Sequence, residues 1–380
     1  MRIGVPKEIK TRESRVGLVP AAVAELTRRG HAVCVERAAG QGIGASDADY
    51  LAAGATVLPE AESVFARSEL IVKVKEPQAE ERQWLRPGHL LFAFLHLAPD
   101  AAQTRELLAS GATCIAYETV SAPNGGLPLL APMSEVAGRL SVQAGAYALQ
   151  APQGGLGVLL GGVPGVPPAK VVILGGGVVG SNAAAMALGL GAQVTVIDRS
   201  LEVLRRLASR FGPALHTVYA TQDAIAQHIM QADLFIGGVL VPGAAAPKLV
   251  TRDMVARMRP GAVIVDVAID QGGCVETSRP TTHDAPTFVV DGVVHYCVAN
   301  MPGAVPCTSA QALGHATLPF VMALADRGLL ALRDDPHLRA GLNVHRGHLT
   351  QAAVAQAQGL PHIDALVALD AVSAFTPVGL

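Results

Sequence analysis

Residues 170–198 read KVVILGGGVVGSNAAAMALGLGAQVTVID, and this stretch decides the fold of the region around it. Gly175, Gly177 and Gly180 form the pattern GxGxxG between an apolar run of strand length and an Ala-rich run of helical length. The first glycine permits a tight turn, the second lets a pyrophosphate approach the helix N-terminus, and the third permits close packing of helix on strand. A second expected strand ends at Asp198, where a carboxylate can accept hydrogen bonds from an adenosine ribose. The stretch predicts a dinucleotide-binding β-α-β unit, although a glycine-rich joint without a ligand has the same local pattern.

The end of the second strand also predicts which dinucleotide binds. A carboxylate at Asp198 repels the 2′-phosphate of NADP and therefore favours NAD. Arg199, the next residue, is of the type that can pair with that phosphate. We predict a clear preference for NAD.

Apolar runs of strand length alternate with segments of helical period in two regions of the chain, which predicts two parallel sheets with crossover helices. The expected strands cover residues 2–5, 32–36, 69–75, 89–95 and 113–118 in the first region, and 170–175, 193–198, 232–238, 262–269 and 294–299 in the second. Ser134 is expected to cap the long helix between the regions. After Asn300 we expect helices and no strand, with a helix that starts at Thr308 and bends at Pro319.

A chain of 380 residues is long for one hydrophobic core, so we expect two domains. The predicted fold is α/β, with two Rossmann-like doubly wound domains separated by a cleft and the NAD-binding domain inserted in the substrate domain. The expected segments are 1–134 for the first part of the substrate domain, 135–300 for the NAD-binding domain, and 301–380 for a helical part that returns to the substrate domain.

Composition excludes several classes of function. A formal net charge of −2 gives no basic surface for nucleic acid. Five scattered cysteines (Cys34, Cys114, Cys274, Cys297 and Cys307) without a CxxC pair suggest neither disulfides nor a zinc site. Two long uncharged stretches are broken by GGLGVLLGGVPGVPP and GGGVVG, and the charged start MRIGVPKEIKTRESR lacks a signal-peptide core. We expect a cytoplasmic protein without a membrane segment.

Polar residues follow apolar strands at three places, and ligands of parallel sheets bind at the carboxyl ends of strands. Lys75 closes LIVKVK, His96 follows HLLFAFL, and Asp270 follows AVIVDVAI. Arg15 precedes a helix that Pro20 starts, and its guanidinium suits a carboxylate. Each residue alone fits a structural role: a hydrogen-bonded histidine, two solvated cations, or a turn-forming aspartate. Their joint occurrence favours a site.

Nine blocks in order along the chain carry a resemblance to a known family: MRIGVPKEIKTRESRVGLVP, VKVKEP, FLHLA, APMSEVAGR, ILGGGVVG, VLVPGAAAPKLV, DVAIDQGGC, RPTTHD and CVANMPGAVP. Together they resemble the alanine dehydrogenase/nicotinamide nucleotide transhydrogenase family, and specifically its L-alanine dehydrogenases. The resemblance extends almost from end to end and weakens in the last fifty residues. It implies reversible, NAD-linked oxidative deamination of L-alanine to pyruvate and ammonium, by a homo-oligomer that is commonly a hexamer.

The resemblance also implies roles for individual residues. Arg15 and Lys75 match substrate-binding residues, and His96 and Asp270 match the catalytic pair. We expect the first two to hold the carboxylate, His96 to carry protons, Asp270 to steady the ammonium or imine, and Met133 to wall the pocket. The expected cofactor contacts are Ser134, Gly175, Gly177, Val178, Val179, Gly180, Asp198, Val239, Leu240, Ile269, Val298, Asn300 and Met301.

Several positions depart from the family pattern. Val203 and Ala220 stand where a basic residue and a serine are often found near the adenosine, so a raised Michaelis constant for NAD is expected. Ala323 and Arg327 stand where some members have metal ligands, and neither residue suits that task, so no metal is predicted. Cys307 replaces a residue that is usually basic, and the sequence offers no account of it.

Two other functions remain open. One is an NAD(H)-binding component related to proton-translocating transhydrogenase, which would need no amino-acid site. The other is a non-catalytic nucleotide sensor, which would tolerate loss of the substrate residues. The set Arg15, Lys75, His96 and Asp270 favours the dehydrogenase.

Overall fold

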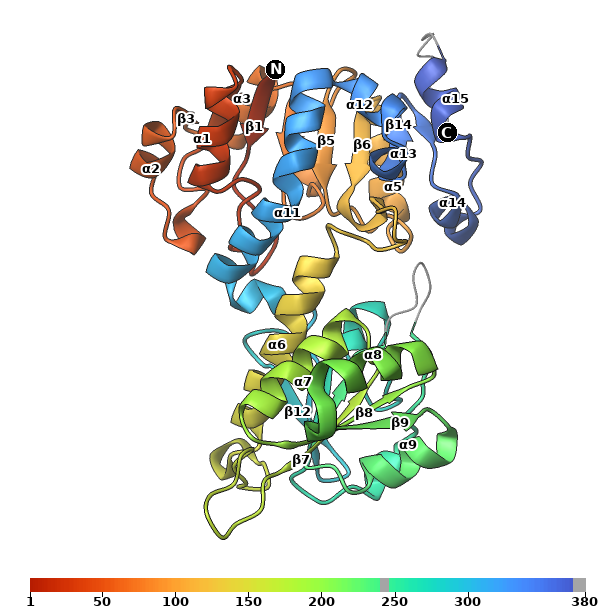
Figure 1. The fold of residues 1–380 in the computed structure, drawn as a ribbon. Coiled ribbons are helices and arrows are strands. Elements are labelled where there is room, and N and C mark those ends of the chain that lie inside the picture. Colours follow the sequence, from red (N-terminus) through yellow and green to blue (C-terminus); the bar gives the residue numbers. More distant parts are fainter. Residues whose placement is uncertain (240–245, 372–380) are drawn as a thin grey trace. The chain divides into compact units, whose positions relative to one another are not determined.

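The computed structural model describes residues 1–239 and 246–371 (Figure 1). The chain divides into two compact units. Unit 1 consists of Met1–Met133 and Val305–Leu380, and unit 2 consists of Ser134–Ala304. Each unit has its own sheet flanked by helices, so the predicted α/β class with two doubly wound domains is confirmed. That unit 1 binds the substrate and unit 2 the cofactor remains a prediction.

Unit 1 is built on a mostly parallel sheet. Its strands are β1 (Arg2–Val5), β2 (Ala32–Glu36), β3 (Thr56–Leu58), β4 (Leu70–Val72), β5 (Leu90–Ala93), β6 (Thr113–Ala116), β14 (Leu342–His345) and β15 (His348–Leu349). They lie in the order β15-β14-β6-β5-β4-β1-β2-β3, and β1 to β6 pair in parallel. The strand order reverses between β1 and β4, which is where ligands of such sheets bind.

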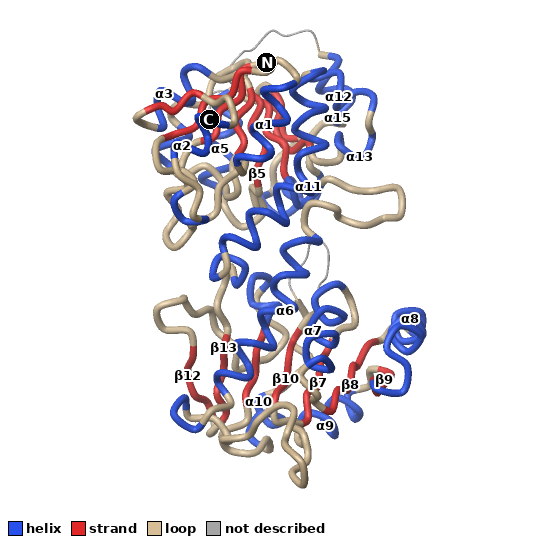
Figure 2. Tube along the Cα trace, turned by 60° about the vertical axis from the view of Figure 1, so that its left-hand side comes forward, coloured by secondary structure: helices blue, strands red, loops and turns tan. Residues whose placement is uncertain are grey.

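Helices connect and cover these strands. The helices of unit 1 are α1 (Pro20–Arg28), α2 (Asp47–Ala52), α3 (Ala61–Arg67), α4 (Ala79–Arg82), α5 (Ala101–Ser110), α11 (Pro306–Arg327), α12 (Leu329–Asp334), α13 (Pro336–Arg339), α14 (Ala352–Gln358) and α15 (Ala365–Asp370), with the 3-10 turns η1 (Gln41–Ile43) and η2 (Tyr117–Thr119). The late helix α11 packs beside α1, so chain segments from the two ends of the sequence form one layer (Figures 1 and 2).

Unit 2 repeats the order of the first five strands of unit 1 along the chain and differs in the remaining strands. Its strands are β7 (Lys170–Leu174), β8 (Gln193–Asp198), β9 (Leu215–Tyr219), β10 (Leu234–Gly237), β11 (Val263–Asp266), β12 (Thr287–Val290) and β13 (Val293–Tyr296). The order is β12-β13-β11-β10-β7-β8-β9, visible as a row of strands in Figure 2, and β12 alone pairs antiparallel among these described strands. The reversal falls between β7 and β10.

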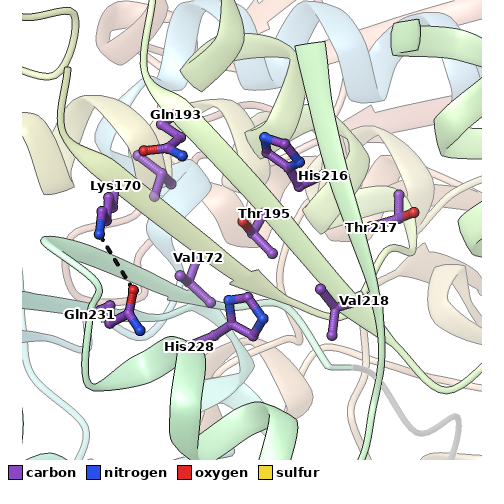
Figure 3. A pocket seen from close by; sticks show the side chains of 10 residues that line it. Lys170, Val172, Gln193, Thr195, His216, Thr217, Val218, His228 and Gln231 are labelled. Atoms are coloured by element: carbon purple, nitrogen blue, oxygen red, sulfur yellow. Dashed lines mark hydrogen bonds between the residues drawn. The ribbon is translucent and has the colours of Figure 1, made fainter. Parts of the chain in front are cut away.

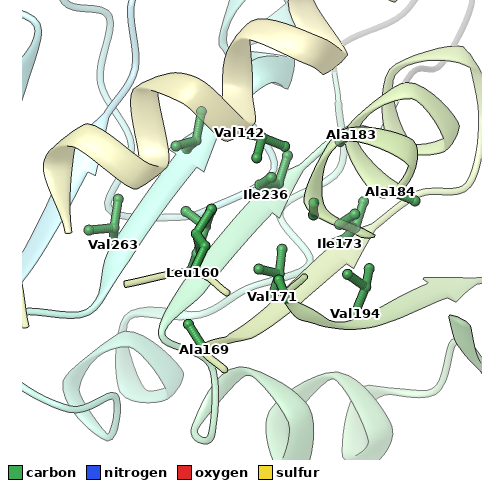
Figure 4. Packing of buried hydrophobic residues seen from close by; sticks show 14 of the residues in the cluster. Val142, Leu160, Ala169, Val171, Ile173, Ala183, Ala184, Val194, Ile236 and Val263 are labelled. Atoms are coloured by element: carbon green, nitrogen blue, oxygen red, sulfur yellow. The ribbon is translucent and has the colours of Figure 1, made fainter. Parts of the chain in front are cut away.

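Apolar residues on both faces of this sheet build two cores. The helical elements of unit 2 are α6 (Ala131–Ala148), whose first three residues belong to unit 1, η3 (Ala151–Gln153), α7 (Val178–Gly189), α8 (Leu201–Phe211), η4 (Gly212–Ala214), α9 (Gln222–Ile229), α10 (Arg252–Ala256), η5 (Val267–Gln271) and η6 (Met301–Ala304). On one face, Val142 of α6 and Ala183 of α7 pack against Ile173 and Ile236 of the sheet (Figure 4). On the other face, residues of α9 and α10 cover Phe235.

The expected strands are present, but the prediction that no strand follows Asn300 is wrong. Strand β14 pairs with β6, and β15 pairs with β14, so the C-terminal region adds to the sheet of unit 1. The strands β3, β9 and β12 were also not predicted. Several of these strands are short or carry polar residues. They therefore lack the apolar run from which the other strands were predicted.

Two predicted helix starts are also wrong. The helix assigned to begin at Ser134 starts at Ala131, so Ser134 lies inside α6 and is not its N-cap. The helix assigned to begin at Thr308 starts at Pro306, a residue suited to a first helical position. Pro319 lies inside that helix, α11. Among the helices of the described residues, none combines the length and apolar character needed to cross a bilayer.

Candidate functional site

The glycine-rich turn after β7 has the geometry that a dinucleotide requires. Gly175 has φ +96°, and a Cβ placed there would lie 2.8 Å from the carbonyl oxygen of Gly238. A Cβ at Gly180 would lie 1.8 Å from the Gly175 oxygen, so α7 meets the turn too closely for any side chain. A Cβ at Gly177, the N-cap of α7, would meet nothing within 4 Å. This open position at a helix N-terminus fits a pyrophosphate.

Asp198, at the end of β8, is tied to the same turn. Its Oδ2 accepts a hydrogen bond from the Gly176 N–H at 2.7 Å, and its Oδ1 accepts one from the Ser200 N–H at 2.7 Å. The carboxylate is therefore fixed beside the turn, and each oxygen keeps a lone pair for a ribose hydroxyl. Val203, one of the departures from the family pattern, is half-buried and packs against the apolar core beside Gly176.

The other expected cofactor residues lie at the same edge of the unit 2 sheet. They are Val178 and Val179 in the first turn of α7, Val239 after β10, Ile269 in η5 after β11, and Val298, Asn300 and Met301 after β13. Ser134 lies one turn before Gly138 of α6, which approaches the Val179 oxygen so closely that a Cβ would be 2.3 Å from it. Leu240 lies outside the described residues.

The sequence predicted that Asp270 directly follows a strand, and this is wrong. Strand β11 ends at Asp266, and Asp270 lies in the 3-10 turn η5, where its side chain is exposed. Its Oδ1 accepts a hydrogen bond from the Asn300 N–H at 3.1 Å, so two of the predicted site residues are in contact. Asp266 itself is fully buried and accepts hydrogen bonds from the Cys274 and Val275 N–H groups, which closes the loop that contains η5.

Arg15 is buried in the loop between β1 and α1, with 2% of its surface exposed. Its Nε and Nη2 donate to the two carboxylate oxygens of Glu13 at 2.7 and 2.5 Å. Its Nη1 lies 3.1 Å from the sulfur of Met133. The guanidinium is thus held along one edge by Glu13 and lies next to Met133, the expected pocket wall.

Lys75 is half-buried and follows β4 by three residues, because that strand ends at Val72. The loop that carries it is pinned by Glu8, whose Oε1 accepts the Val74 N–H at 2.6 Å and, at 3.4 Å, the Lys75 N–H. The other Glu8 oxygen pairs with Lys73 at 3.1 Å, and Lys73 pairs with Glu81 at 2.7 Å, all fully or almost fully buried. Burial raises the pKa of Glu8. Burial alone would lower the pKa of Lys73, but the two carboxylates raise it.

His96 follows β5 by three residues and has φ +49°, a left-handed conformation that is uncommon for residues other than glycine. Glu118 accepts hydrogen bonds from the Leu95 and His96 N–H groups, at 3.2 and 2.6 Å. Its Oε1 lies 3.9 Å from His96 Nδ1. The imidazole is 47% exposed, and its Nδ1 edge faces Glu118.

The structure therefore groups the predicted residues within each unit. Arg15, Lys75 and His96 occupy the loops after β1, β4 and β5, which are neighbours in the sheet and straddle its reversal point. A hollow of about 240 Å³ opens beside Arg15 and is lined by Lys7, Glu8 and Glu13 among others. Glu8, Glu13 and Glu118 were not predicted from the sequence. The charged residues in PKEIKTRESR and the glutamate that ends TCIAYE were the available signals.

A larger hollow, of about 330 Å³, lies in unit 2 (Figure 3). Lys170, Gln193 and His216 stand at the first or second residues of their strands, and His228 and Gln231 come from the end of α9 and the residues after it (Figure 3). The hollow therefore lies at the amino ends of these strands, whereas the glycine-rich turn lies at their carboxyl ends.

Within residues 1–239 and 246–371, no group of three or more His, Cys, Asp or Glu residues could hold a metal ion.

Comparisons with known proteins agree along most of the chain. Residues 4–137 match the family model for the N-terminal domain of alanine dehydrogenase/PNT, and residues 141–352 match the model for the C-terminal domain. The alanine dehydrogenase of Halomonas elongata is 62% identical over 366 residues, which are 96% of this chain and 99% of that protein. The alanine dehydrogenase of Mycobacterium tuberculosis is 55% identical over 95% of this chain and 98% of its own length.

Solved structures give the same relationship. A structure of L-alanine dehydrogenase superposes with a TM-score of 0.92 at 55% identity and covers 94% of this chain and 99% of its own. The transhydrogenase from Sinorhizobium meliloti superposes with a TM-score of 0.81 at 26% identity over 92% of this chain and 100% of its own.

Proposed function

The chain belongs to the alanine dehydrogenase/PNT family, and from this membership we propose that it catalyses the reversible, NAD-dependent oxidative deamination of L-alanine to pyruvate and ammonium. The observation that supports this most is the near-full-length identity to alanine dehydrogenases, combined with Arg15, Lys75 and His96 at three neighbouring strand ends. The lower identity of 26% to the transhydrogenase structure favours the dehydrogenase over that alternative.

The residues of unit 1 bind the substrate carboxylate and transfer protons. Arg15 and Lys75 bind the alanine carboxylate. The Glu13 contact holds the Arg15 guanidinium in place, and Glu8 fixes the backbone of the loop that carries Lys75. His96 takes a proton from the substrate ammonium and later moves protons as water adds to the imine and ammonia leaves. Because Nδ1 faces Glu118, we assign this exchange to Nε2.

The residues of unit 2 supply the cofactor site. The open position at Gly177 and the α7 N-terminus hold the pyrophosphate, and Asp198 holds the adenosine ribose. When bound, NAD accepts the hydride from C2 of alanine. Asp270, fixed by the Asn300 N–H, steadies the substrate cation. Oxidation of alanine therefore needs the residues of unit 1 for the substrate and those of unit 2 for NAD.

The test is the rate of NADH formation from L-alanine and NAD at alkaline pH. The expected result is turnover with alanine, weaker turnover with serine, glycine or 2-aminobutyrate, and clearly lower efficiency with NADP because Asp198 repels its phosphate. His96→Ala should lower kcat by about a hundredfold or more while NADH binds with nearly unchanged affinity. Failure of the wild-type protein to oxidise alanine while it binds NADH would favour the transhydrogenase-like or sensor alternative.

We also propose a homo-oligomer, specifically a hexamer, in the cytoplasm and without a metal at Ala323 and Arg327. The family resemblance supports the assembly, and symmetric homo-oligomers are common among soluble enzymes. Light scattering coupled to size exclusion should give about six times the 39.1 kDa of one chain. A monomer would contradict this part of the proposal without affecting the reaction.

A further inference from the structure

The aromatic residues behind His96 suggest how its ring is held. His96 is exposed and in a left-handed conformation, and its contact with Glu118 involves only the Nδ1 edge. The Glu118 bonds to the Leu95 and His96 N–H groups fix the backbone but leave the side-chain torsions free. A proton carrier must keep its reactive nitrogen aimed at the substrate. Some other group must therefore restrict the rotation of the imidazole.

Phe94 is placed to do this. Its ring is stacked on the His96 imidazole, with planes inclined by 2° and centroids 5.6 Å apart, which is an offset parallel arrangement. Phe94 is itself 3% exposed, so unlike the imidazole it cannot move freely. Its ring also meets Tyr117 edge-on, at 5.1 Å and 82°. Tyr117 is fully buried and meets Phe92 of β5 in the same way, at 4.4 Å and 88°.

We propose that Phe94 is a positioning residue for the proposed reaction: its buried ring, braced by Tyr117, holds the His96 imidazole in the orientation that proton transfer requires. The inference rests on the proposed role of His96. It predicts that loss of the Phe94 ring lowers kcat more than it raises KM, because the substrate carboxylate is bound by other residues.

The chain offers a matched control in Phe92. Both phenylalanines are buried and both contact Tyr117, but Phe94 also stacks on His96. Phe94→Leu and Phe92→Leu should therefore lower the melting temperature to a similar extent. Only Phe94→Leu should lower kcat, by about tenfold or more, with KM for alanine changed by less than about threefold and NADH affinity unchanged. Phe94→Tyr should restore much of the lost kcat.

A spectroscopic signature separates positioning from general damage. The Phe94 ring current shifts the imidazole carbon-bound proton resonances of His96 in spectra of selectively labelled histidines, with His96→Asn used to assign them. These resonances should move in Phe94→Leu and stay in place in Phe92→Leu. If Phe94→Leu does not fold, Phe94→Met, which keeps the volume without the ring, takes its place.

Unchanged kcat and unchanged resonances in the Phe94 variant, or an equal loss of kcat in Phe92→Leu, would overturn the proposal. Failure of the wild-type protein to oxidise alanine would instead contradict the proposed function. The resonance shift would then still show whether the stack orients the ring.

Discussion

Two glycines of the glycine-rich turn after β7 differ in how much space surrounds them. A Cβ at Gly180 would overlap the Gly175 oxygen, whereas a Cβ at Gly177 would point into open space, and the Gly177 φ of −68° is accessible to any residue. The first glycine is therefore required by the fold. No steric contact of the fold requires the second, which is consistent with the proposed pyrophosphate site.

Alanine substitutions should separate these two requirements. Gly180→Ala should lower the free energy of unfolding by about 1–3 kcal/mol because the helix must shift. Gly177→Ala should change it by less than about 0.5 kcal/mol but weaken NADH binding by about tenfold or more, because the new methyl group occupies the path of the pyrophosphate. Urea unfolding and NADH fluorescence titration measure both quantities. Equal NADH affinity for Gly177→Ala and wild type would contradict the assignment of this turn.

The candidate site residues differ in how far sequence alone predicts them. Arg15, Lys75, His96 and Asp270 stand out because each is polar at the end of an apolar run. Glu8 and Glu118 do not, because their contacts to the loops of Lys75 and His96 span 66 and 22 residues along the chain. Such partners come together only when the strands pair in the folded protein. A local sequence pattern therefore cannot predict them.

At the scale of elements, strand β14 shows why part of the sheet escaped prediction. Its sequence LNVH is half polar, yet all four residues are buried. Asn343 donates to Thr119 and to the Gly341 oxygen, and His345 Nδ1 lies 2.8 Å from Thr113 Oγ1 of the adjacent β6. The strand is stabilised by partners in another segment, so its composition does not indicate a strand. By contrast, the buried positions of β7 are all apolar, those of β11 are apolar except for Asp266 at its end, and both strands were predicted.

The burial of His345 predicts that this edge of the sheet is sensitive to acid. Burial lowers the pKa of His345 to about 4, from an ordinary value of 6.5. In this range the unfolded chain binds the proton and the folded chain does not, so stability is lost as the pH falls from 6.5 toward 4. The loss between pH 7 and 4.5 should be about 2 kcal/mol from this residue.

Urea unfolding of unit 1 at the two pH values measures this loss. His345→Asn should reduce the pH dependence, although it also removes the bond to Thr113. His362→Asn, at an exposed loop position, serves as the control and should leave the dependence unchanged. An unchanged slope in His345→Asn would show that another group governs the acid sensitivity.

At the scale of the whole molecule, unit 2 is continuous in sequence while unit 1 is assembled from both ends of the chain. The two hydrophobic clusters around the unit 2 sheet draw all their members from Leu140 to Met301. A core of this kind does not depend on residues outside the unit.

A fragment of residues 131–304, which retains all of α6, should therefore unfold cooperatively and bind NADH but not turn over alanine. Calorimetry and NADH titration check this, with Gly177→Ala in the fragment as a folded variant of weakened binding. A fragment without a cooperative transition would mean that unit 2 depends on unit 1 for its stability.

The central claim is that the groups at the strand ends of both units serve direct transfer of hydride from alanine to NAD. The most direct measurement is the fate of deuterium when the protein converts L-[2-²H]alanine and NAD in ordinary water. The account predicts one deuterium at C4 of the nicotinamide of each NADH formed, with none lost to solvent. NADH without deuterium, or no NADH at all, would contradict it.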